Sequence, residues 1–100
     1  MSVPSLPLIF APEANDDLID IQSYTELTYG ESQWFIYRSR LNDAFTLLSE
    51  HPYTGSTRDE LPANYRVFPV EQHRIIYFVT DNAINVVRIL HRSRDILRHI

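Results

Sequence analysis

The last third of the chain most strongly limits what it can fold into, because three apolar segments follow one another with almost no chain between them. These segments run from Tyr65 to Val70, from His73 to Thr80 and from Ile84 to His91. The connections at 71–72 and 81–83 are so short that neighbouring strands have to run antiparallel. The last segment is apolar at both alternating positions, which is typical of a strand with neighbours on both sides. We therefore predict a meander of three antiparallel strands, with 84–91 in a central position.

Two amphipathic helices are predicted before these strands. The first begins at Pro12 and ends near Gly30, and apolar side chains recur every three or four residues at Ala14, Leu18, Ile21, Tyr24 and Leu27. The second begins at Glu31 and ends at His51, because a residue that precedes proline is pushed out of helical geometry. Its apolar positions are Trp34, Tyr37, Leu41, Ala44, Phe45 and Leu48, widened by Phe35, Ile36 and Leu47. A stripe this wide favours two neighbours, a sheet and the first helix.

The two ends of the chain complete the expected fold. A short apolar strand is predicted from Leu6 to Phe10, where Pro4 and Pro7 suit its beginning. Asp95 is a suitable cap for a short helix from Ile96 to Ile100. We therefore predict one α+β domain over residues 1–100, in which an N-terminal strand and a helical hairpin pack on one face of a small, largely antiparallel sheet.

Composition excludes several classes of function. The 100 residues contain no cysteine, which rules out thiol chemistry and fits a reducing compartment, so we expect a soluble cytoplasmic protein without a signal peptide or membrane span. The net charge of −4 argues against a general nucleic-acid binder, because such proteins usually carry a basic excess. The charge is uneven: residues 1–50 hold eight acids and two arginines, whereas residues 51–100 hold five acids and seven arginines.

One sparse set of residues could carry acid–base chemistry. Glu60 lies in the predicted loop, Arg74 near the start of the middle strand and His91 at the end of the last one. A carboxylate, a guanidinium and an imidazole could act as base, phosphate clamp and acid in phosphodiester cleavage. The residue types alone favour ordinary structural roles for all three, so no catalytic residue is favoured. The chain has no glycine-rich phosphate loop and its histidines lack metal-ligand spacing, so we expect neither a cofactor nor a metal.

A partner-binding surface is the alternative use of the basic half. Its candidate residues are Arg66, Arg74, Arg88, His91, Arg92 and Arg94. Arginine forks on one rim would hold carboxylates or phosphates by paired hydrogen bonds. Arg88 differs from the others because it interrupts an apolar strand. It therefore has to find a carboxylate or reach a groove, since an unpaired buried charge is costly.

The order of these motifs resembles the ParE-type toxins. The run YRVFPVEQHRIIYFVTDNAINVVRILHRSRD is similar to the C-terminal signature of that family, a Phe-Pro-Val strand, a His-to-Tyr strand, a polar turn and a strand that ends in Ile-Leu-His. The segments FAPEANDDLIDIQSYTELTYGE and LLSEHPYTGSTRDEL resemble the family's first helix and the link before its sheet. One departure is Ser93-Arg94-Asp95, where many members have Arg-Met-Asp.

This resemblance implies the toxin half of a type II toxin–antitoxin module in a bacterium. Members of the ParE type inhibit DNA gyrase, use no known cofactor and are neutralised by a ParD-type antitoxin. The wider superfamily also contains RelE- and YoeB-type toxins, which cut mRNA on the ribosome, and Glu60, Arg74 and His91 fall near the YoeB-type catalytic positions. The absence of lysine, the acidic total and a tail without tyrosine favour gyrase inhibition here.

Overall fold

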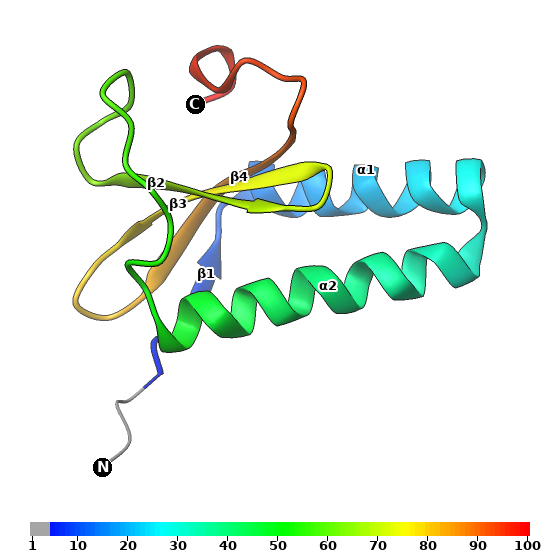
Figure 1. Ribbon diagram of the computed structural model, residues 1–100, viewed down its shortest axis with the longest axis horizontal. Coiled ribbons are helices and arrows are strands. Elements are labelled where there is room, and N and C mark those ends of the chain that lie inside the picture. Colours follow the sequence, from blue (N-terminus) through cyan, green and yellow to red (C-terminus); the bar gives the residue numbers. More distant parts are fainter. Residues whose placement is uncertain (1–4) are drawn as a thin grey trace.

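The computed structural model describes residues 5–100 and has the expected α+β architecture (Figure 1). Strand β1 (Leu8–Phe10) leads into helix α1 (Pro12–Tyr29), and helix α2 (Glu31–Glu50) returns beside it. A long loop leads to strands β2 (Tyr65–Val70), β3 (His73–Val79) and β4 (Ile84–His91) and then to a single 3-10 turn, η1 (Ile96–Arg98). Pro4, which we expected to precede the first strand, lies outside the described residues.

The four strands form one sheet in the order β1-β4-β3-β2. The three C-terminal strands pair antiparallel, and β1 pairs parallel with β4, so the predicted meander and the central position of β4 are confirmed. Figure 1 shows both helices on one face of this sheet. Their length carries the α1–α2 turn well beyond the ends of the strands.

Two apolar clusters hold the layers together. The larger lies between the helices and the sheet, and it includes Trp34, Leu41 and Leu48 of α2 together with Ile75 and Tyr77 of β3. The smaller lies on the opposite face, beneath the 51–64 loop and η1, and contains Leu61, Val67, Ile76, Leu90 and Ile96. Both faces of the central strands are therefore buried. This explains why their sequences are apolar on both faces instead of alternating between apolar and polar residues.

A β-bulge in β4 changes which side chains face the helices. Ile76 pairs with Arg88 while Tyr77 pairs with Val86, so Val87 has no partner of its own in β3. Simple alternation places Leu90 on the same face as Ile84 and Val86, and that expectation is wrong. The extra residue moves Leu90 into the smaller cluster and turns Ile89 and His91 toward the helices.

Several N–H groups on the outer side of β2 and on the side of β4 that faces away from β3 already have partners. On β2, Tyr65 and Val67 donate to the carbonyls of Pro62 and Ser56, at 2.9 Å each, and Pro69 has no N–H to donate. On β4, the Ile84 N–H donates to the Pro7 carbonyl, and the Ile89 N–H donates to a side chain of α1. These contacts reduce the number of main-chain groups that β2 and β4 offer to another strand.

The far end of the helical hairpin is more exposed than its apolar pattern predicts. Tyr24 is 63% and Leu27 89% exposed, although both continue the apolar stripe of α1. Phe35 and Ile36 of α2 are also exposed. The physical reason is visible in Figure 1, because this part of the hairpin extends past the sheet that would have covered it. In the last turns of α1, Thr25 is buried instead, and its hydroxyl donates to the Ile21 carbonyl.

Candidate functional site

A groove lies where the helical hairpin passes the ends of β3 and β4. It consists of two hollows of about 460 and 420 Å³, one beside α1 and the exit of β4, the other between the hairpin and the β2–β3 turn. Tyr24, His73 and His91 line both, and we call the joined hollows the hairpin groove.

No helix between residues 5 and 100 combines the length and the apolar character needed to cross a bilayer.

Two histidines from adjacent strands form the floor of the hairpin groove. His73 opens β3 and pairs in register with His91 at the end of β4, and their rings meet edge to face with centroids 5.4 Å apart. This meeting depends on the bulge at Val87, because His91 would otherwise point away from the helices. The Nδ1 atom of His91 is held by Ser93, whose N–H donates to it at 3.1 Å.

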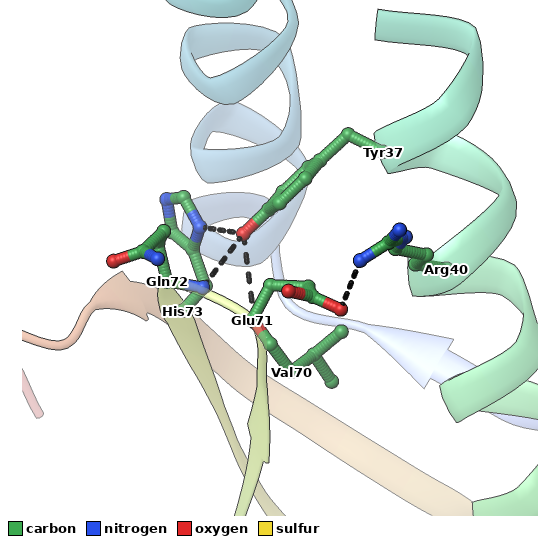
Figure 2. Close-up of polar contacts among 6 residues, drawn as sticks. All are labelled: Tyr37, Arg40, Val70, Glu71, Gln72 and His73. Atoms are coloured by element: carbon green, nitrogen blue, oxygen red, sulfur yellow. Dashed lines mark hydrogen bonds and ion pairs between the residues drawn. The ribbon is translucent and has the colours of Figure 1, made fainter. Parts of the chain in front are cut away.

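Tyr37 of α2 fixes the His73 ring (Figure 2). The Gln72 N–H donates to the Tyr37 hydroxyl at 3.3 Å, and the hydroxyl contacts Nδ1 of His73, whereas the Val70 carbonyl is 3.5 Å away. We assign the phenol proton to the bond with Nδ1, because the Val70 carbonyl lies at the limit of hydrogen-bond distance; in this assignment His73 is neutral with its own proton on Nε2. Burial, and then the neighbouring His91, lower the pKa of His73 to about 4, while Asp17 acts in the opposite direction. Burial also raises the pKa of Tyr37.

An ion pair closes one end of the hairpin groove. Asp17 of α1 accepts two hydrogen bonds of 2.8 Å from the Arg88 guanidinium and one of 2.9 Å from the Ile89 N–H. Arg88 also donates to the His99 carbonyl at 2.9 Å, so it joins α1 to the C-terminal segment. The hydrogen bond with Asp17 is the main reason that the pKa of Arg88 is raised. Arg88 was predicted either to find a carboxylate or to reach a groove, and it does both, because it binds Asp17 and lines the hairpin groove.

A second ion pair closes the other end. Arg40 of α2 donates to Glu71 in the β2–β3 turn, as Figure 2 shows. Glu71 has a φ of 52°, in the left-handed region that residues other than glycine seldom adopt. The pair therefore fastens α2 to a strained turn, which places Gln72 and His73 against Tyr37.

The six predicted partner-binding residues do not share one surface. Arg66 stacks on the Tyr53 ring, 5.0 Å from its centroid, and donates to the Gly55 carbonyl at 2.7 Å, so it organises the 51–64 loop. Arg88 is occupied by Asp17. The expectation of a single arginine rim is therefore corrected, because local carbonyls and a carboxylate hold these two side chains.

Three of the remaining residues lie together at the exit of β4. His91 and Arg94 line the hairpin groove, and Arg92 is exposed beside them. Arg74 donates to the Arg92 carbonyl at 2.8 Å and so fixes the backbone of the exit turn. Within residues 5–100, neither Arg92 nor Arg94 has an ion pair.

The alternative catalytic set is not assembled in this structure. Arg74 follows His73 directly in β3, so the two side chains leave opposite faces of the sheet. Its partner in β4 is Leu90, which belongs to the cluster away from the helices, whereas His91 faces the hairpin groove. Glu60 is exposed in the loop beneath that other face and does not line either hollow. Among residues 5–100, no three carboxylate or imidazole side chains are gathered closely enough to hold a metal ion.

Comparison with known proteins identifies the family. The family model described as "ParE toxin of type II toxin-antitoxin system, parDE" matches residues 8–96. The chain belongs to the ParE toxin family. Because the match runs from β1 to the beginning of η1, it includes the helices and strands that line the hairpin groove but not His99.

Named relatives agree with this assignment. The chain is 28% identical to Toxin ParE1 of Caulobacter vibrioides over 94% of its own length and 97% of the relative's. It is 30% identical to Toxin ParE1 of Mycobacterium tuberculosis, with 92% and 95% coverage. A chain from the structure titled "Chromosomal ParDE TA system from P. aeruginosa" superposes with a TM-score of 0.74 at 16% identity, covering 89% of this chain and 98% of that one, which supports the ParE-type fold.

Sequence reasoning missed three residues that shape the site of this ParE-family chain. Tyr37 was predicted only as one member of an apolar helix stripe, and neither Asp17 nor His73 was assigned a role in a site. A signal was available for Asp17, because Arg88 required a carboxylate and α1 supplies several. The role of His73 had no such signal, since its contact with His91 depends on the bulge.

Proposed function

We propose that this ParE-family chain inhibits DNA gyrase in the bacterial cytoplasm and is neutralised by a ParD-like antitoxin that occupies the hairpin groove. The observation that carries this proposal is the family match over residues 8–96, together with relatives that are covered almost end to end. The groove supports it as well, because it has the features of a binding surface rather than of an acid–base centre.

The walls of the hairpin groove suit an amphipathic peptide segment. Tyr24 and Tyr29 of α1 and Tyr37 of α2 present aromatic surface, which binds apolar side chains at a low entropic cost. The rings of Tyr24 and Tyr29 meet edge to face but are mostly exposed, so their burial would contribute to affinity. A disordered segment that folds on binding could cover this length of groove.

The exit of β4 supports contact with an acidic partner or with the gyrase–DNA complex. Arg92 and Arg94 stand side by side with exposed side chains, and Arg74 holds the backbone between them in place. Planar guanidinium groups bind carboxylates or phosphates through paired hydrogen bonds. We therefore propose that Arg92, Arg94 and His91 contact partners directly and that Arg74 acts by positioning Arg92.

A gyrase supercoiling assay beside a cell-free translation assay tests the target. We expect the purified chain to block supercoiling, to trap cleaved DNA with gyrase, and to leave translation unchanged. Glu60→Gln should inhibit gyrase as the parent does, whereas the double change Arg92→Ala/Arg94→Ala should weaken inhibition at least about tenfold. Ribosome-dependent mRNA cleavage that Glu60→Gln or His91→Ala abolishes would overturn the proposal in favour of a YoeB-type nuclease.

Antitoxin binding needs a separate measurement. We expect the product of a short reading frame beside this gene to bind with nanomolar affinity and to restore supercoiling. Tyr24→Ala should weaken that complex at least about tenfold, because this exposed side chain lines both hollows. Leu47→Ala is a matched control, since Leu47 is an exposed apolar residue outside the groove.

A further inference from the structure

The histidine pair at the floor of the hairpin groove presents two hydrogen-bond donors that nothing in residues 5–100 accepts. In the assignment made above, Nδ1 of His73 accepts a hydrogen bond from the Tyr37 hydroxyl. Nδ1 of His91 accepts a hydrogen bond from the Ser93 N–H. Each neutral ring therefore carries its proton on Nε2, and neither Nε2 atom has a hydrogen-bond partner among these residues. The rings stand together where the two hollows join.

Most of the charged side chains around this histidine pair already form ion pairs with each other. From the helices, Asp17 is bound to Arg88 and Arg40 is bound to Glu71 of the β2–β3 turn. Among the other ionisable groups that line the groove, Asp20 of α1 contributes a negative charge, Arg94 a positive charge and His99 a further imidazole. The guanidinium of Arg94 and the Nε2–H donors of the two neutral imidazoles are thus the groups left for an anionic ligand.

A single carboxylate fits these surroundings better than a phosphate. Asp20 lines the groove without an ion pair among residues 5–100 and would repel a doubly charged anion more strongly than a singly charged one. The tyrosines Tyr24 and Tyr37 offer apolar surface next to the imidazoles. A glutamate or aspartate side chain on an amphipathic peptide combines the two properties that the groove offers.

We propose that an acidic side chain of the antitoxin docks between His73 and His91 and that the complex takes up a proton from solvent when it forms. This inference rests on the proposed function, because it names the chemistry by which the antitoxin is held. No covalent bond changes: the proton goes to Nδ1 of His73, and the Tyr37 hydroxyl turns from that atom toward the Val70 carbonyl.

Proton uptake follows from the state of His73 in the free chain. Its pKa of about 4, lowered by burial and by His91, leaves the ring unprotonated near neutral pH. A carboxylate within about 4 to 6 Å strengthens proton binding by a histidine about ten- to a thousandfold. The bound ring then titrates closer to neutral pH, so the complex holds more protons than its separated parts. Affinity should therefore increase as the pH falls from 7.5 to 6, by up to about tenfold for each pH step of one.

Titration calorimetry of the toxin with its antitoxin tests this directly. Measurements at pH 6.0 in two buffers with different ionisation heats give the number of protons bound, and we expect about 0.1 to 0.9 proton per complex, as a ten- to thousandfold gain on a pKa of about 4 predicts. His73→Gln should abolish the uptake and flatten the pH dependence of Kd. His51→Gln should retain both, because His51 is exposed at the end of α2 and does not line the groove. A complex that forms tightly without proton uptake would overturn the inference while leaving the antitoxin proposal intact.

A probe that needs no antitoxin provides an independent test. Sodium acetate, titrated into the isotope-labelled chain, should shift the ring signals of His73 and His91 and leave His51 unchanged. Larger shifts with sodium phosphate than with acetate would overturn the inference and indicate a phosphodiester ligand. Equal shifts at all three histidines would also overturn it. Since this probe acts on the free toxin, it separates failure of the histidine site from failure of the antitoxin proposal.

Discussion

Replacing Asp17 by alanine should destabilise the chain more than any change to an exposed acid. The carboxylate is the shared acceptor for Arg88 and for the Ile89 N–H, and the side chains of Asp17 and Arg88 are only 11% and 21% exposed. Breaking a buried pair from one side costs about 3 to 5 kcal/mol, because the other charge remains without a partner. Arg88 keeps its bond to the His99 carbonyl and some contact with water, so we expect the lower end, about 3 kcal/mol.

The loss is large enough to measure and small enough to leave the chain folded. Domains of this size have about 5 to 15 kcal/mol of stability, and 1 kcal/mol moves the melting temperature by about 4 to 8 °C. Urea unfolding followed through Trp34, the only tryptophan and a buried one, gives the change in free energy. Asp43→Ala is the control, because this exposed acid of α2 has no ion pair within the described residues.

A double change separates the ion pair from other effects of the mutation. Asp17→Leu combined with Arg88→Met replaces both charges by apolar groups, and such replacements are often close to neutral. The double variant should lose less stability than the sum of the two single changes, by at least about 1 kcal/mol. A loss below about 1 kcal/mol for Asp17→Ala alone would refute the reasoning, since Arg88 would then be satisfied without its carboxylate.

Three further changes test the fold. The pKa of His73 is about 4 in the folded chain and near 6.5 when the chain is unfolded. Stability should therefore be full above pH 6.5 and fall by about 1 to 2 kcal/mol toward pH 4. His73→Gln should remove this pH dependence of stability in urea titrations. Gly55→Ala should cost about 1 to 3 kcal/mol in the same assay, since its added Cβ would lie 2.6 Å from the Tyr77 hydroxyl; an unchanged midpoint would show that the loop yields. Leu27→Ser should stay within about 0.5 kcal/mol of the parent by thermal melting, because Leu27 is 89% exposed, and a larger loss would indicate packing that the structure lacks.

Much of the fold follows from local patterns in the sequence. The short connections at 71–72 and 81–83 determine which strands pair, and proline and glycine mark the helix boundaries at Pro12, Gly30 and Pro52. Asp95 accepts a hydrogen bond from the Leu97 N–H, as a cap should, although the segment after it makes a single 3-10 turn rather than the predicted helix. Signals of this kind act over a few residues, so they are readable without tertiary information.

The groove could not be predicted in the same way, because it depends on where elements end relative to one another. The exposure of Tyr24 results from helices longer than the strands beneath them, and the sequence of α1 alone does not state the length of the sheet. The bulge at Val87 gives no clear local signal, yet it decides that His91 meets His73. The need of Arg88 for a carboxylate was predictable, but its partner Asp17 lies 71 positions away in the sequence.

The occupied edges of the sheet have a consequence for how a neutralised toxin is set free. With Ser56, Pro62 and Pro69 beside β2 and Asp17 beside β4, an antitoxin segment bound along these strands would have few main-chain bonds to make, so the proposed complex would be retained chiefly by what its side chains bury. Affinity of that kind would be lost in steps, because each residue that a protease removes from the segment takes away its own contribution. Loss of a hydrogen-bonded strand would instead be cooperative. Reactivation would then be graded by how far digestion has proceeded.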